Sequence, residues 1–197
     1  MIIGLTGPAR SGKDTVAQYL VSDYGFKHFD FYRDVFLDEL KKKKMQPTKD
    51  NASKLGDELR AKGGRGVMAQ LLFPKIDVED AVVTGFRSPE EIEFFRSKTT
   101  KFFLIMLEAP ADTRYGRRNE SDPQSKDDFL GRDERDLQNK GMEAVFLMAD
   151  FVIQNDVGVE ELNSHIDEIM EEIISEGKVE GDGKDAEEEE YEEEEDE

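Results

Sequence analysis

The residues best suited to chemistry lie near the start of the chain, in the stretch Gly7-Pro-Ala-Arg-Ser-Gly-Lys13. An apolar run precedes this stretch, and a pattern typical of an amphipathic helix follows it at once. A glycine loop between a strand and a helix wraps backbone N–H groups around a phosphate chain, and its lysine neutralises the outer phosphates. The helix N-terminus adds its dipole to the same anion. This Walker A pattern predicts a binding loop for a nucleoside triphosphate, and we expect ATP with Mg²⁺. The residues expected to contact the nucleotide are Gly7, Ala9, Arg10, Ser11, Gly12, Lys13, Asp14 and Thr15.

Asp14 occupies the position where such loops usually carry a serine or threonine that meets magnesium. Thr15 follows, so the motif reads G-K-D-T. Nucleoside monophosphate kinases commonly read G-K-x-T here, and several phage deoxynucleotide kinases resemble the G-K-D-T form. The variant favours a small-molecule kinase over a switch GTPase or a motor ATPase, with Asp14 and Thr15 as the residues expected at Mg²⁺.

A second set of candidates consists of arginines on either side of the polar stretch Arg117–Asp128, whose proline and serines predict a mobile loop. Phosphoryl transfer depends on charge neutralisation and on a lid that excludes water. Arginine suits this task because its planar fork binds phosphate oxygens. The alternative is that these arginines pair with neighbouring acidic residues on helix surfaces. The predicted lid, residues 114–135, contains Arg114, Arg117, Arg118, Arg132 and Arg135.

Three residues are candidates for binding the phosphate acceptor. Arg87 follows an apolar run at the position where open α/β sheets bind ligands, Arg60 precedes Gly63-Gly64, and Asp34 follows the second apolar run. Asp34 could orient or deprotonate an acceptor hydroxyl, a role for which Asp30 competes. The alternatives are that Arg60 is simply exposed and that Arg87 and Asp34 cap helices. His28 and His165 are expected to be structural.

The apolar run 81–84 ends in Thr84, where enzymes with this loop often place an aspartate for magnesium. Asp14, Asp30 or Asp34 would then supply the carboxylate, or Thr84 would hold a metal-bound water.

Apolar runs alternate with helical patterns along the chain, which predicts an α/β fold. We expect five parallel strands flanked by helices in the three-layer arrangement of P-loop NTPases, with a helical acceptor-binding region over residues 31–75. The expected strands cover residues 1–5, 26–30, 81–84, 101–107 and 151–153. The expected helices cover residues 12–23, 31–44, 48–73, 110–118, 126–148 and 158–175, and one more starts at Pro89.

Composition excludes several classes of site and of protein. The 197 residues contain no cysteine, which excludes disulfides, thiolate metal sites and a cysteine nucleophile. No apolar run is long enough to span a membrane and no signal peptide is evident, so we expect a cytoplasmic protein.

Of the net charge of −20, −11 lies in residues 178–197, with thirteen acidic residues against two lysines. We therefore expect a kinase domain over residues 1–177 and a disordered acidic tail, which either aids solubility or contacts a basic partner. The chain lacks a basic patch for nucleic acid.

Several motifs occur in an order that resembles an archaeal-type P-loop kinase family related to dephospho-CoA kinases and nucleoside monophosphate kinases. They are TGPARSGKDT (6–15), TGFRSPEEIEFF (84–95), GRDERDL (131–137) and ADFVIQND (149–156). The resemblance implies ATP, magnesium, a five-stranded parallel core, an acceptor domain and a lid. It implies that Lys13 and Thr15 hold phosphates, that Arg87 and Asp34 sit at the acceptor, that Arg132 belongs to the lid and that Asn155 lies near the adenine. Asp14 and Thr84 depart from the family pattern.

The leading hypothesis is a kinase that transfers the γ-phosphate of ATP to a nucleotide-like small molecule. Lys13, Asp34, Arg87 and Arg132 are its expected catalytic residues. A nucleoside monophosphate is favoured as acceptor, with dephospho-CoA as the alternative. A hydroxyl acceptor needs a base, so near-normal turnover in Asp34→Asn would argue against one. The other class of protein that fits is an ATP-binding regulator without kinase activity. Both a monomer and a homodimer are compatible with the sequence.

Overall fold

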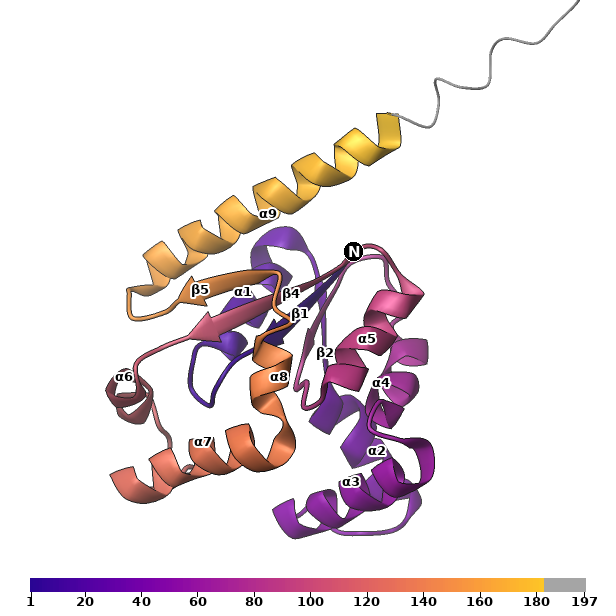
Figure 1. Cartoon of the computed structure of the whole chain (residues 1–197), viewed down its shortest axis with the longest axis vertical. Coiled ribbons are helices and arrows are strands. Elements are labelled where there is room, and N and C mark those ends of the chain that lie inside the picture. The colour runs from indigo at the N-terminus through magenta and orange to yellow at the C-terminus, as the bar shows by residue number, and fades with distance from the viewer. Residues whose placement is uncertain (183–197) are drawn as a thin grey trace, which may run out of the picture. The chain divides into compact units, whose positions relative to one another are not determined.

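The core of the protein is one parallel β-sheet (Figure 1). The computed structural model describes residues 1–182, apart from the side chains of residue 49 and of residues 136–140 and 176–182. The strand order is β2-β3-β1-β4-β5. The strands are β1 (Ile2–Thr6), β2 (Lys27–Asp30), β3 (Ala81–Thr84), β4 (Phe102–Glu108) and β5 (Phe151–Gln154). Each lies where the apolar runs predicted it, and the five-stranded parallel sheet is confirmed.

Strand β1 lies between β3 and β4, and its pairing with them sets the relative positions of the segments that follow the three strands. Leu5 is opposite Thr84 in β3, and Thr6 is opposite Met106 in β4. All five residues of β1 are buried, as expected for a central strand covered on both faces. Because all three strands run in the same direction, the segments that follow them emerge side by side at one edge of the sheet.

Helices cover both faces of the sheet and form the expected layers. On one face, α4 (Val67–Leu72), α5 (Pro89–Lys98) and α8 (Met142–Phe146) share a core with alternate strand residues such as Val83 and Leu104. Phe86, Phe95 and Phe102 join this core with their ring centroids 5.3–5.9 Å apart. Side chains alternate across a strand, so Val82 and its counterparts point to the opposite face. There α1 (Lys13–Tyr24) lies against β1 and β3.

Residues 31–75 form the helical region predicted between the second and third strands. It consists of a π-helical turn η1 (Tyr32–Phe36), α2 (Leu37–Lys42), α3 (Lys49–Gly63), α4 and a short 3₁₀ turn η2 (Phe73–Lys75). The Thr48 side chain caps α3 by accepting a hydrogen bond from the backbone N–H of Asn51 at 3.2 Å. Leu40, Ala52 and Leu55 give this region a small core of its own. The helix expected over residues 48–73 is divided at Gly63–Gly66 into α3 and α4.

The predicted single helix over residues 126–148 is wrong. Two helices are present, α7 (Lys126–Lys140) and α8, after the shorter α6 (Ala111–Gly116). They are separated by Gly141, whose φ of +70° is the left-handed conformation that ends helices at glycine. The break redirects the chain, so that α7 contacts α6 while α8 contacts α5.

Helix α9 (Val159–Asp182) belongs to a second unit, Val159–Glu197, which is described here by itself. It begins where the sequence predicted a last helix and carries Leu162, Ile166, Met170 and Ile173 at helical spacing. The helix continues into the first residues of the acidic segment. The rest of the predicted tail, residues 183–197, lies outside the described residues. Within the described part of the chain, no helix is long and apolar enough to cross a membrane.

The loop that follows β1 passes close to the backbone of β4. This close approach gives a prediction about stability. Gly7 has a φ of +137°, and a Cβ there would lie 2.2 Å from the backbone oxygen of Leu107. Gly25, which ends α1, also has positive φ, but a Cβ there would meet nothing within 4 Å. We expect Gly25→Ala to cost about 1 kcal/mol from backbone strain alone, and Gly7→Ala to cost more because it adds a clash with backbone. Urea unfolding measures both free energies, and equal losses would contradict the packing described here.

Candidate active site

The loop that follows β1 adopts the conformation of a phosphate cradle. Gly7, Arg10 and Gly12 all have positive φ, and such turns direct successive backbone N–H groups toward one point. A Cβ on Gly12 would lie 2.1 Å from the side-chain nitrogen of Asn155. That Asn155 nitrogen donates a hydrogen bond to the backbone oxygen of Ser11 at 2.7 Å. Asn155, directly after β5, therefore stabilises the backbone of the phosphate loop.

Lys13 folds back over its own loop. Its ammonium donates to the backbone oxygens of Gly7 and Pro8 at 2.9 and 2.7 Å and lies 3.4 Å from the Ser11 hydroxyl. Removal from water, followed by the nearby charge of Arg87, lowers the pKa of Lys13 to about 8. An anion at the loop would favour the charged form of this lysine, so the site suits a phosphate chain.

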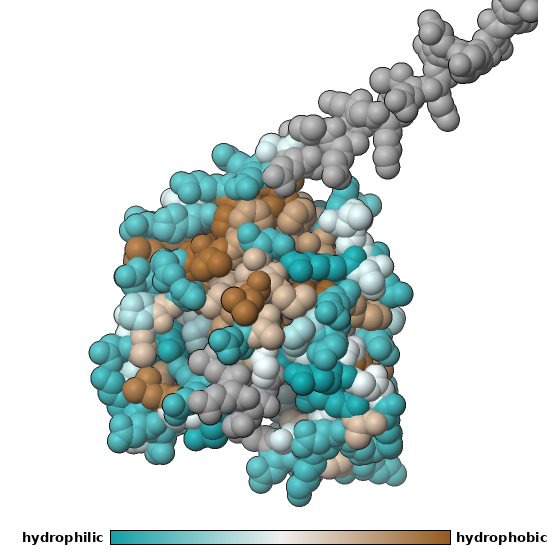
Figure 2. Space-filling model, viewed as in Figure 1, coloured by the Kyte–Doolittle hydropathy of each residue, from teal (hydrophilic) through white to brown (hydrophobic). Residues whose placement is uncertain are grey.

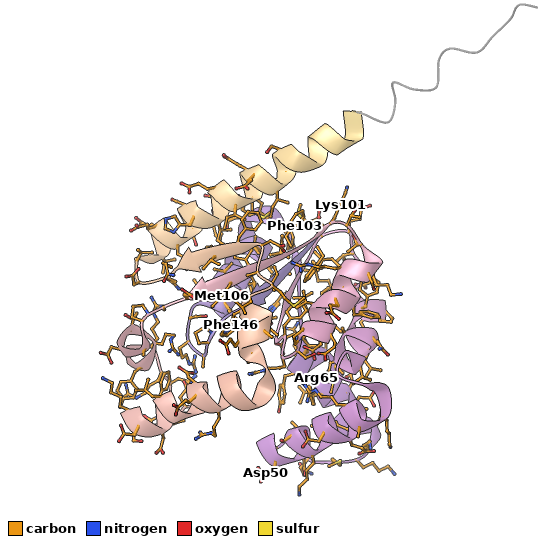
Figure 3. All side chains as sticks on the ribbon, viewed as in Figure 1. Asp50, Arg65, Lys101, Phe103, Met106 and Phe146 are labelled. Atoms are coloured by element: carbon orange, nitrogen blue, oxygen red, sulfur yellow. The ribbon has the colours of Figure 1, made fainter. Side chains whose placement is uncertain are left out.

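A cavity of about 530 Å³ opens beside the loop, at the edge where β1, β3 and β4 end. Lys13 forms part of its wall, as does Arg87 after β3. Figure 3 shows Met106 of β4 and Phe146 of α8 at this part of the molecule. The remaining lining residues come from the ends of the three strands, from α6, α7 and α8, and from β5. They are Leu5, Thr6, Gly7, Pro8, Ala9, Gly85, Phe86, Glu108, Ala109, Pro110, Arg114, Asp133, Met142 and Gln154.

Arg114 of α6 joins three parts of the site. Its guanidinium donates to the backbone oxygen of Ala9 in the loop at 3.1 Å and to that of Ala109 after β4 at 2.9 Å. It also forms an ion pair with Asp133 of α7, and both side chains are largely buried. Asp133 was not among the sequence candidates, yet it is a cavity carboxylate whose charge acts on Lys13.

Asp122, in the segment between α6 and α7, bridges the loop and the lid. It accepts hydrogen bonds from Arg10 at 2.6 Å and from Arg132 of α7 at 2.7 Å. Burial raises the pKa of this carboxyl, but hydrogen bonds from Arg132, the backbone N–H of Asn119 and Arg10 outweigh burial and lower the pKa to about 2. The segment predicted as a mobile loop is thus attached to the phosphate loop.

Other arginine nitrogens, within residues 117–132, lack a hydrogen-bond partner. In the part of the chain that the structure describes, they are Nη1 of Arg117, Nε of Arg118, and Nε and Nη2 of Arg132, all buried. Buried cationic donors without acceptors are costly, and an anion with several oxygens would satisfy them. These buried nitrogens are therefore donors available to an anion.

The predicted acceptor residues do not all meet at the cavity. Arg87 lines the cavity, but Arg60 and Asp34 do not. Arg60 lies 4.0 Å from the carboxylate of Glu91, a residue that is only 1% exposed. Burial raises the pKa of Glu91 to about 7, and its oxygen accepts from the backbone N–H of Arg87 at 2.7 Å. Asp34 pairs with Arg33 at 2.8 Å and accepts from the backbone N–H of Asp30 at 2.7 Å.

Thr84 stands where an aspartate was expected. Its side chain contacts a carboxylate of the neighbouring strand. Its hydroxyl donates to Asp30 at 2.9 Å, and the two residues are directly paired in the register of β2 and β3. His28 contacts the same hydroxyl at 2.9 Å, and burial, with the charge of Arg33, lowers its pKa. The position of Asp30 thus brings a carboxylate to the end of β3. Asp14 and Thr15 lie exposed in the first turn of α1.

Comparisons with known proteins identify the family. A family model described as an AAA domain (AAA_17) matches residues 6–135. A UPF0200 protein from Thermococcus onnurineus is 30% identical over 187 residues, covering 89% of this chain and 100% of that protein. A second, from Pyrococcus abyssi, is 30% identical over 189 residues, covering 88% of this chain and 97% of that protein. The chain belongs to the UPF0200 family. The archaeal-type P-loop kinase resemblance found in the sequence is thereby confirmed.

Solved structures share the fold. Shikimate kinase from Bacteroides thetaiotaomicron superposes with a TM-score of 0.61 at 14% identity, covering 87% of this chain and 98% of that chain. TT1252 from Thermus thermophilus superposes with a TM-score of 0.59 at 20% identity, covering 87% and 97%. At such identities the likeness establishes the P-loop kinase-like fold.

The pKa of Lys13 gives a prediction for nucleotide binding. Because this pKa is lowered to about 8, the empty site loses its proton as the pH rises through that value. An anion favours the protonated lysine, so binding above pH 8 requires proton uptake. We expect the affinity for ATP to fall between pH 8 and 9.5, with proton uptake visible by calorimetry in buffers of different ionisation enthalpy. Lys13→Ala should bind weakly and show no such uptake. The same pH slope in that variant would contradict this assignment.

The bridge through Asp122 gives a second prediction. Asp122→Asn leaves Arg10 and Arg132 with partly buried charges that lack their counter-ion, which should destabilise the ligand-free protein by about 2–4 kcal/mol. ATP would supply negative charge to the same arginines, so ATP should raise the melting temperature of the variant more than that of the wild type. Asp127→Asn, in the first turn of α7, is the control. An equal ATP-induced shift in the variant and the wild type would refute the idea.

Proposed function

We propose that this protein transfers the γ-phosphate of ATP to a nucleotide-like small molecule. The observation that carries the proposal is that Lys13 belongs both to the phosphate loop and to the wall of the 530 Å³ cavity. A triphosphate at the loop would thus place its outer phosphate beside a second binding space. Such a volume is within the usual range for small-molecule sites.

Charge and closure support transfer rather than simple binding. Lys13, Arg87 and Arg114 meet at the boundary between loop and cavity, where they would neutralise charge on the transferring phosphoryl group. The partnerless nitrogens of Arg117, Arg118 and Arg132 would bind the donor as the lid. With the donor enclosed, water would be kept from the reacting phosphate.

The oxygen donors present fit Mg²⁺, the ion expected with ATP. Magnesium binds through one or two carboxylates together with phosphate oxygens and water. Thr15 and Asp14 in the first turn of α1 and Asp30 beside Thr84 are the residues that would hold it. When bound, the ion would supply positive charge to the phosphates.

A nucleoside monophosphate is the acceptor that the site supports best. A phosphate oxygen is already anionic and needs no general base, and the side chain of Asp34 is turned away from the cavity onto Arg33. Dephospho-CoA is the second candidate, favoured by Asp133, whose carboxylate at the cavity beside Lys13 could accept a proton from a hydroxyl. Asp133→Asn would therefore abolish turnover with a hydroxyl acceptor and reduce it less with a phosphate acceptor.

The test is ADP formation in the presence of Mg²⁺, ATP and a panel of ribo- and deoxynucleoside monophosphates together with dephospho-CoA. We expect one acceptor class to stimulate turnover, and Lys13→Ala to reduce the stimulated rate by about 10²–10³. Lys101→Ala, at the amino end of β4 (Figure 3), is the matched control that should retain activity. ATP binding without stimulation by any acceptor would favour an ATP-binding regulator.

A further inference from the structure

The cavity lining combines two chemically different sets of side chains. Lys13, Arg87 and Arg114 are cations. Phe86, Met106, Met142 and Phe146 are apolar. A ligand that carries both an anionic group and an apolar part would match this lining.

The break between α7 and α8 brings apolar side chains to the cavity. Because Gly141 turns the chain, α8 presents Met142 and Phe146, four residues apart and thus on one helix face, to the cavity. Met106 reaches the same space from β4 (Figure 3). Met106 and Met142 are almost fully buried, at 7% and 4% exposed, whereas Leu147, the residue after α8, is 82% exposed. Within α8, Glu143 and Ala144 are exposed, so the α8 face that lines the cavity is distinct from the face in solvent.

We propose that Phe146, Met142 and Met106 form a slot for a planar aromatic ring of the acceptor, with the acceptor's anionic group directed toward Lys13 and Arg87. This inference rests on the proposed function and specifies its acceptor as a compound bearing a nucleobase or a similar ring. Aromatic rings stack on phenylalanine, and thioether sulfurs make favourable contacts with ring edges. Such contacts tolerate different bases, because every base has a π-face.

The same slot disfavours a sugar or polyol as the acceptor body. Phenylalanine offers no hydrogen-bonding group and the methionine thioether only a weak acceptor. Hydroxyl groups buried there would lose their water without gaining partners, at an appreciable cost in binding free energy. Hydrogen-bonding side chains at this cavity, such as Gln154, Glu108 and Asp133, come from elements other than α8.

Calorimetric binding of nucleoside monophosphates and of ribose 5-phosphate tests the slot, because ribose 5-phosphate keeps the anion and the sugar but lacks the base. The titrations are run with and without a non-hydrolysable ATP analogue, which keeps the monophosphates out of the phosphate loop. We expect at least one monophosphate to bind about tenfold or more tightly than ribose 5-phosphate. Phe146→Ala should remove most of this difference, and Phe146→Leu, which conserves apolar packing, should remove part of it. Leu147→Ala, the adjacent exposed position, should retain it.

Equal affinities for ribose 5-phosphate and every monophosphate, or no binding of any of them, would overturn the slot. So would a base preference that survives in Phe146→Ala. These readouts need no turnover. A base preference that depends on Phe146 but comes with no phosphoryl transfer would therefore support the slot and contradict the proposed function.

Discussion

The parallel pairing of β1 with β3 and β4 is the constraint on which the site depends. It places Leu5 opposite Thr84 and Thr6 opposite Met106, so the phosphate loop, Arg87 and the end of β4 emerge at one edge. A shift of one residue would turn every strand side chain to the other face and separate these groups. The strands hold their register through backbone hydrogen bonds and through side chains buried on both faces. The geometry of the candidate site is thus fixed by the central strands of the sheet.

The site concentrates positive charge in a chain whose net charge is −20. Carboxylates lie between the arginines: Asp133 is beside Arg114, and Asp122 is between Arg10 and Arg132. Burying like charges together would otherwise be unfavourable, and Asp122 also links the segment between α6 and α7 to the loop. In the described part of the chain, some buried nitrogens of Arg117, Arg118 and Arg132 have no acceptor, and an anion would satisfy them.

The face of the molecule that Figure 2 shows carries apolar side chains among largely polar ones. The exposed large apolar residues include Leu147, directly after α8, and Val152 of β5. Isolated exposed apolar side chains are common in soluble proteins. Phe146, the neighbour of Leu147, lines the cavity instead.

Local sequence patterns predicted the loop, the strands and the helical region, because each depends on a few adjacent residues. They could not predict which carboxylate reaches the site. Asp34 and Asp30 are equally placed along the chain, and only the pairing of β2 with β3 brings Asp30 to Thr84. Asp133 was only one of several acidic neighbours with which the lid arginines could pair, and Asp122 could not be singled out because its partner Arg10 is 112 residues away. Met142 and Phe146 were missed because residues 126–148 were taken as one helix. The Lys140–Gly141 pair was the available signal, since glycine commonly ends helices.

The central claim is that a phosphoryl group crosses from the loop at Lys13 to a molecule in the adjoining cavity. Phosphorus NMR of a reaction with ATP, Mg²⁺ and the acceptor that best stimulates ADP formation follows the fate of the γ-phosphate directly. The structure predicts that the γ signal reappears as a phosphoryl group bonded to the acceptor, in an amount equal to the ADP formed. Release of the whole γ signal as inorganic phosphate, with the acceptor unchanged, would contradict the claim.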